Sequence, residues 1–127
     1  MLKAFQRRVQ CMIRLVWGTG QAATAKASFD TALAAANLHE YNLRRLSSVI
    51  PADATLDFTE TAPDLGATGN ALDVVMARKT SPPGARAAAG LAWARRDDGS
   101  GIFYEVDDTD PETVGDLLAA GIEHGCE

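Results

Sequence analysis

The stretch YNLRRLSSVIP, residues 41–51, decides how this 127-residue chain folds and what chemistry it could perform. Its first six residues alternate as a strand does, with Tyr41 and Leu43 on one face. The serine pair Ser47-Ser48 then closes the strand, directly before a turn that contains Pro51. Such a setting can strain a peptide bond so that a serine hydroxyl attacks its own backbone. Two serines can equally do no more than end a strand.

The regions on either side of this stretch predict further strands and two helices. Apolar periodicity and turn residues predict strands over 12–17, 41–46, 71–77, 87–94 and 101–106, a short strand over 55–59, and helices over 22–37 and from 109 or 110 onward. Strands 87–94 and 101–106 are close enough to form a hairpin. Because strands outnumber helices, the sequence predicts an α+β fold in one domain, a layered sandwich of mainly antiparallel strands with flanking helices.

The composition of the chain limits the partners and the cellular compartment that we expect for it. The net charge is −5, with basic residues at 1–14 and ten acidic residues but no Lys or Arg at 97–127, which argues against nucleic acid as a partner. No apolar run is long enough to cross a membrane, so we expect a soluble cytoplasmic protein. Cys11 and Cys126 suggest no disulfide framework, and the histidines lack metal-ligand spacing, so we expect no metal site. Translation could start at Met1 or at Met12.

A glycine pair offers a competing function. Gly18-Thr19-Gly20 follows a predicted strand and precedes a predicted helix, as phosphate-binding loops do. Ala23 stands where a dinucleotide-binding motif has its third glycine, and no Walker lysine follows. A tight connection between strand and helix is the better interpretation, and a nucleotide-binding module is a weak alternative.

The serine pair allows a more specific chemistry. Attack of Ser48 on the Ser47 carbonyl would give an ester, and elimination followed by hydrolysis would leave a pyruvoyl group at a new amino terminus. Asn42, six residues upstream, has a side-chain amide that could stabilise the oxyanion. A pyruvoyl ketone can form a Schiff base with an α-amine and accept electrons as carbon dioxide leaves. The residues therefore suggest a cofactor made from the chain itself.

Several motifs, in order, resemble those of the pyruvoyl-dependent arginine decarboxylases. They are the strand ending LVWGTG at 15–20, the helix core SFDTAL at 28–33, the stretch from Asn42 to Pro51, and the late strands AGLAWA at 89–94 and GIFYE at 101–105. The resemblance covers nearly all of the chain after Met12.

The resemblance implies a role for six residues. Ser48 would be the pyruvoyl precursor and Ser47 the new carboxyl end, so that the chain divides into 1–47 and 48–127. Asn42 would assist processing. Asp30 would bind the substrate guanidinium, with Leu33 against its methylenes, and Glu105 would donate a proton to the carbanion. The family implies L-arginine as substrate, agmatine as product for polyamine synthesis or arginine breakdown, and active sites between the subunits of a homotrimer, which could pair into a hexamer.

Chemistry of the residues fits these roles, with one departure. A carboxylate such as Asp30 can bind a planar guanidinium through two hydrogen bonds, although it could also be an ordinary surface acid. Lys26 stands one helical turn before Asp30, where the family usually has an apolar residue, and could compete with the substrate. The alternatives are therefore a decarboxylase of the same build for another amino acid, or a trimeric relative without catalysis.

Overall fold

The structure, a computed structural model, describes residues 12–125. Cys11, Cys126, Met1 and the basic residues before Met12 lie outside the described residues, so the predictions that concern them are not addressed. The elements in chain order are β1 (Met12–Leu15), α1 (Ala25–Ala35), β2 (Asn42–Arg45), β3 (Val49–Ile50), β4 (Thr55–Phe58), β5 (Ala71–Val74), β6 (Ala88–Arg95), β7 (Gly101–Asp108) and α2 (Pro111–Gly125).

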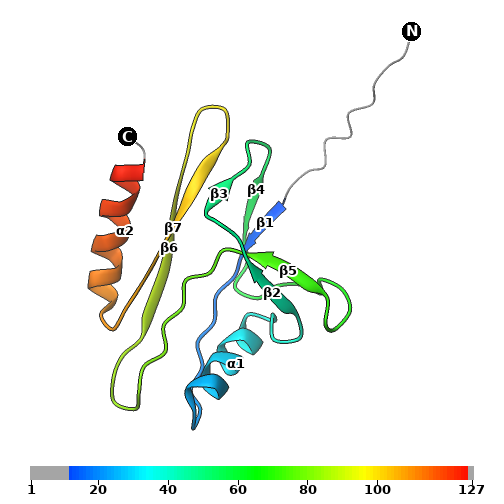
Figure 1. Ribbon diagram of the computed structural model, residues 1–127, viewed down its shortest axis with the longest axis vertical. Coiled ribbons are helices and arrows are strands. Elements are labelled where there is room, and N and C mark those ends of the chain that lie inside the picture. The colour runs from blue at the N-terminus through cyan, green and yellow to red at the C-terminus, as the bar shows by residue number, and fades with distance from the viewer. Residues whose placement is uncertain (1–11, 126–127) are drawn as a thin grey trace.

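The described strands form three small sheets. β1 pairs with β4 and β2 with β5, both in parallel, whereas β3, β7 and β6 form an antiparallel sheet in that order (Figure 1). The α+β class is confirmed, but the pairing is less antiparallel than the sequence predicted. The sequence can predict pairing where a short turn joins two neighbouring strands. The parallel partners have other elements between them in the chain, so their pairing could not be predicted in this way.

The predicted hairpin is confirmed as β6 and β7, with Leu91 opposite Glu105 and Trp93 opposite Phe103. In its turn the carboxylate of Asp98 accepts hydrogen bonds from the hydroxyl and the backbone N–H of Ser100, at 2.6 and 2.8 Å. These bonds, the hydroxyl's first, lower the pKa of Asp98 below the ordinary carboxyl value. The charged carboxylate therefore supports the turn that sets the register of the hairpin.

α2 covers one face of this hairpin (Figure 1). Val114 is 6% exposed, and a Cβ on Gly90 of β6 would lie 3.0 Å from Val114 Cγ1 and 2.8 Å from Leu118 Cδ1. A glycine is thus what lets the strand approach the helix. The helix begins at Pro111, one or two residues after the predicted start at 109 or 110, and the missing N–H of proline costs nothing at that position.

The opposite face of the sheet contributes to the core. Ile50 of β3, Phe103 of β7 and Ala54 are buried, and Ile13, Leu15, Leu56 and Val75 pack against them from the parallel strands. The core therefore joins the antiparallel sheet to β1, β4 and the end of β5. β3, which the sequence did not predict, places Ile50 in this core, whereas Val49, directly after the serine pair, is exposed.

α1 has clear ends. The Thr24 hydroxyl accepts a hydrogen bond from the Ala27 N–H at 3.1 Å at its start. At its end Asn37 adopts a left-handed backbone, φ 60°, and its side-chain amide donates to the Ala62 carbonyl at 2.9 Å. The helix is shorter at both ends than the predicted 22–37.

Candidate functional site

The serine pair lies in the short connection between β2 and β3 and is anchored on both sides. The Leu46 N–H donates to the Val74 carbonyl at 2.8 Å, and the Phe103 N–H donates to the Ser48 carbonyl at 2.7 Å. Ser47 is exposed and Ser48 is half-buried. The backbone on either side of the Ser47–Ser48 peptide bond is therefore held by neighbouring strands.

Glu105 is the residue that the Ser48 side chain contacts. The Ser48 hydroxyl donates to the Glu105 carboxylate, with Oγ 2.9 Å from Oε2 and 3.3 Å from Oε1. Successive strand residues point to opposite faces, so Glu105 and the buried Phe103 lie on the same face of β7. A carboxylate at this distance can take the hydroxyl proton as the oxygen attacks a carbonyl carbon. The resemblance in sequence implied a role for each residue but did not predict this contact, which joins positions 57 residues apart.

Asn42 is not bound to the serine pair in this structure. It stands at the start of β2, and its side-chain amide donates to the Gly69 carbonyl at 2.7 Å. Ser48 lies six residues further along the chain, and a strand advances about 3.3 Å per residue. The start of β2, where Asn42 stands, is therefore well separated from the serine pair. The oxyanion contact expected of Asn42 is not formed in the single chain.

Asp30 and Leu33 also lie apart from Ser48. Both are on α1, with Asp30 exposed and Leu33 half-buried. Figure 1 shows α1 at the end of the molecule away from β3. Asn42 starts β2 and contacts Gly69 rather than α1 or the serine pair. The predicted residues therefore form one group of Ser47, Ser48 and Glu105 and a second group of Asp30 and Leu33 on α1, with Asn42 in neither.

Lys26 makes no ion pair with Asp30. Among residues 12–121, whose side chains the structure describes, the one ion pair closer than 4.0 Å joins Arg44 to Asp73, with Nε 2.8 Å from Oδ1. Both Lys26 and Asp30 are exposed. The competition that the sequence suggested between Lys26 and a substrate cation is absent in this conformation.

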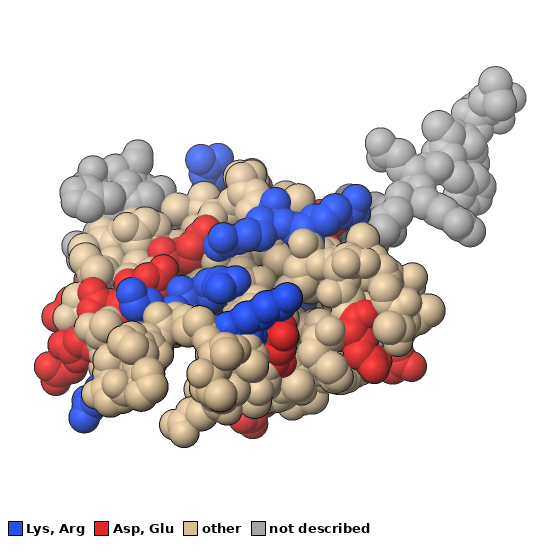
Figure 2. All heavy atoms as spheres, turned by 60° about the horizontal axis from the view of Figure 1, so that its bottom comes forward, with Lys and Arg blue, Asp and Glu red and all other residues tan. Residues whose placement is uncertain are grey.

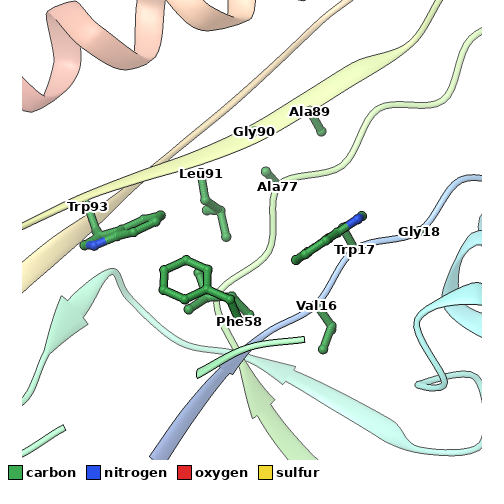
Figure 3. Close-up of a pocket in the computed structure, with 10 residues that line it drawn as sticks. Val16, Trp17, Gly18, Phe58, Ala77, Ala89, Gly90, Leu91 and Trp93 are labelled. Atoms are coloured by element: carbon green, nitrogen blue, oxygen red, sulfur yellow. The ribbon is translucent and has the colours of Figure 1, made fainter. Parts of the chain in front are cut away.

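An open apolar groove of about 350 Å³ lies on the face of the antiparallel sheet that bears Glu105. Leu91 lines it and stands directly opposite Glu105, so the two side chains share that face. Figure 3 shows Trp17, Phe58 and Trp93 around the groove, with the Phe58 and Trp93 rings 5.2 Å apart. Trp17 and Phe58 are 54% and 55% exposed. The remaining lining residues are Leu15, Val16, Gly18, Ala77, Ala89 and Gly90.

Sequence reasoning missed this aromatic surface. Trp17 and Trp93 were noticed only as parts of strand motifs, and β1, β4 and β6 meet here only in three dimensions. Large side chains exposed together in a groove are typical of a surface that another molecule covers.

The glycine pair is explained by packing. A Cβ on Gly20 would lie 2.6 Å from both the Ala32 nitrogen and the Ser28 carbonyl oxygen, and one on Gly18 would meet the Ala32 carbonyl oxygen. These are backbone atoms of α1, so a Cβ at either glycine would require the helix to shift. The glycines therefore let the connection lie against the side of the helix, which supports the interpretation as a tight connection.

Charged side chains of both signs lie close together on the face drawn in Figure 2, so this face is not a uniformly basic surface of the kind that nucleic acids need. Neither helix in the described part of the chain is long and apolar enough to span a membrane.

Comparisons with known proteins support the resemblance seen in the motifs. The family model for pyruvoyl-dependent arginine decarboxylase matches residues 12–127. Two curated proteins named pyruvoyl-dependent arginine decarboxylase, from two strains of Halobacterium salinarum, are each 56% identical to this chain over 117 residues, covering 91% of this chain and 72% of the relative. A family match over nearly the whole described region and identity at this level leave one assignment: the chain belongs to the pyruvoyl-dependent arginine decarboxylase family.

Proposed function

We propose that this protein cleaves itself between Ser47 and Ser48 and then converts L-arginine to agmatine and carbon dioxide. The hydrogen bond between the Ser48 hydroxyl and the Glu105 carboxylate is the observation that most supports this proposal. The names of the relatives in Halobacterium salinarum support arginine as the substrate. In this proposal Glu105 takes the Ser48 proton while Oγ attacks the Ser47 carbonyl carbon, which breaks the Ser47–Ser48 C–N bond and gives an ester. Elimination of this ester releases 1–47 with a carboxylate end, and hydrolysis of the remaining dehydroalanine, with loss of ammonia, leaves the pyruvoyl group on 48–127.

The residues around Ser48 fit a pyruvoyl group at that position. Ser48 is half-buried, and its backbone carbonyl is fixed by the Phe103 N–H. When formed, the group supplies a ketone that accepts electrons as carbon dioxide leaves. Glu105, already within hydrogen-bond reach of the Ser48 side chain, would return a proton to the substrate carbon.

Substrate binding requires residues that one chain does not place at Ser48. We propose that Asp30 and Leu33 of one copy complete the site formed by Ser47, Ser48 and Glu105 of the next, whereas the role of Asn42 in processing stays a prediction from the sequence. The exposed groove around Trp17, Phe58 and Trp93 would be covered in that contact, because it lies on the same sheet face as Glu105. Three such head-to-tail contacts closed into a ring give a homotrimer, which could pair into a hexamer. The layered sandwich predicted for the single domain stays a prediction.

The alternatives differ in what they predict of the purified chain. An enzyme of the same build for another amino acid stays an alternative, although Lys26, which suggested it, makes no ion pair with Asp30 in the described structure. A relative without catalysis would keep the chain uncut. A cytoplasmic location and a role in polyamine synthesis stay predictions from the sequence.

Intact-mass measurement tests the proposal. We expect two fragments, with cleavage after Ser47 and a blocked amino terminus on the larger one. Ser48→Ala should prevent cleavage and activity, because the attacking oxygen is gone. Ser47→Ala is the matched control and should still cleave, because only its backbone carbonyl takes part.

Substrate choice is measured by release of labelled carbon dioxide. We expect release from arginine and none from lysine, ornithine or aspartate. An uncut wild-type chain that leaves arginine intact would refute the proposed function, and cleavage with release from another amino acid would refute the substrate alone.

A further inference from the structure

The side chain of Arg78 lies over the aromatic ring of Phe29. The guanidinium carbon is 3.8 Å from the ring centroid. Phe29 is half-buried on α1, whereas Arg78 is exposed in the segment that follows β5. The face of an aromatic ring attracts a cation, and arginine is the residue most often found there. The contact therefore gives the Arg78 guanidinium a defined place against α1.

That place is next to the residue proposed to bind the substrate. Asp30 follows Phe29 directly on α1, although side chains of consecutive helix residues point in different directions. Arg78 is exposed, so its long side chain, once released from the Phe29 ring, could turn toward the Asp30 carboxylate by rotation of its own bonds. Arg78 also has the same functional group as the proposed substrate, so it would be a direct competitor for Asp30.

The structure places Arg78 on the ring and not on the carboxylate. Within the described residues, the single ion pair closer than 4.0 Å is between Arg44 and Asp73, so neither Arg78 nor Lys26 is paired with Asp30. Asp30 is exposed and open to a guanidinium from outside the chain.

We propose that the Phe29 ring holds the Arg78 guanidinium away from Asp30 and so keeps this carboxylate available to arginine. Phe29 and Arg78 are then specificity-determining residues that act without touching the substrate. This inference rests on the proposed function, in which Asp30 binds the substrate guanidinium.

The test is steady-state kinetics with arginine on the cleaved enzyme. Phe29→Leu removes the ring, so the released Arg78 should compete with arginine and raise KM about two- to fivefold at unchanged kcat, the factor that an exposed cation–π contact represents. Phe29→Tyr keeps the ring and should behave as wild type. The double variant Phe29→Leu with Arg78→Gln removes the competitor and should restore KM toward the wild-type value.

The double variant decides between competition and packing. If Phe29 only packs α1 in place, the double variant will be at least as impaired as Phe29→Leu, and the proposal is overturned. Should Phe29→Leu fail to fold, Arg78→Gln alone is informative. A KM at or below wild type supports the proposal, and a raised KM shows that Arg78 anchors the helix and overturns it.

Asp30→Ala separates this inference from the proposed function. An unchanged KM in Asp30→Ala would refute the role of Asp30 and the present inference together. A raised KM in Asp30→Ala, combined with a double variant that is not restored, would refute the present inference alone.

Discussion

Ser48 and Glu105 together define the chemistry that a single chain can perform. One hydroxyl and one carboxylate are 2.9 Å apart, and the backbone hydrogen bond from the Phe103 N–H to the Ser48 carbonyl ties the Ser48 segment to β7, the strand that carries Glu105. A serine hydroxyl is a weak nucleophile unless a base takes its proton. The geometry therefore suggests that Glu105 serves both self-cleavage and, as a proton donor, decarboxylation.

Replacing Glu105 by glutamine tests this double role. Gln keeps the size of the side chain but cannot take or return the proton, so we expect both cleavage and decarboxylation to slow, the latter by about 10²- to 10⁴-fold. Cleavage is followed by mass spectrometry over time, and turnover by carbon dioxide release.

Asp107→Asn is the matched control, because Asp107 is an exposed acid on the same face of β7. It should leave both rates near wild type. Wild-type rates in Glu105→Gln itself would remove Glu105 from the mechanism.

At the scale of elements, α1 is positioned by the connection that precedes it. Gly18 and Gly20 lie so close to the helix backbone that a methyl group has no room. Asn37 ends the helix in a conformation that few other residues adopt readily. The position of α1, and with it that of Asp30, thus depends on Gly18, Gly20 and Asn37, which all lie outside the helix.

Gly20→Ala should therefore destabilise the protein, by about 1–3 kcal/mol, because the new Cβ meets backbone atoms and the helix must shift. The free energy of unfolding from chemical denaturation measures this effect. We expect KM for arginine to rise as well, since Asp30 moves with α1.

Gly115→Ala in α2 is the control. A Cβ there meets nothing within 4 Å, so alanine should stabilise the protein by roughly 0.5–1 kcal/mol through its helix propensity. A Gly20→Ala protein as stable as wild type would contradict the tight packing of the connection against α1.

At the scale of the whole molecule, the predicted site residues are divided between two regions. Ser48 and Glu105 lie at the antiparallel sheet, whereas Asp30 and Leu33 lie on α1 at the other end (Figure 1). The exposed aromatic groove is continuous with the first region through Leu91. The proposed second copy, if it covers the groove, would account for both observations.

Mixed assemblies test whether the site is shared. Ser48→Ala and Asp30→Ala chains, each poorly active alone, are produced together and assayed at low arginine concentration. A site formed by two copies regains Ser48 from one chain and Asp30 from the other, so random trimers should have about a quarter of their sites intact.

Each variant expressed alone is one control. The second control is a mixture of the two purified variants in which one of them has first been denatured. If the mixture shows only the sum of the separate activities, the site belongs to one chain. Analytical ultracentrifugation of the same samples shows whether the assemblies are trimers or hexamers.

The sequence alone determined the hairpin, both helices and the family, because short turns, helical periodicity and the ordered motifs around the serine pair are local signals. It could not determine the parallel pairings, strand β3 or the aromatic groove, since these depend on segments far apart in the chain. The contact between Ser48 and Glu105 also needed the tertiary structure, because it requires both the alternation of β7 and its pairing with β3. Local sequence patterns thus identified the candidate site residues, and the long-range pairing of strands decided which of these residues contact each other within one chain.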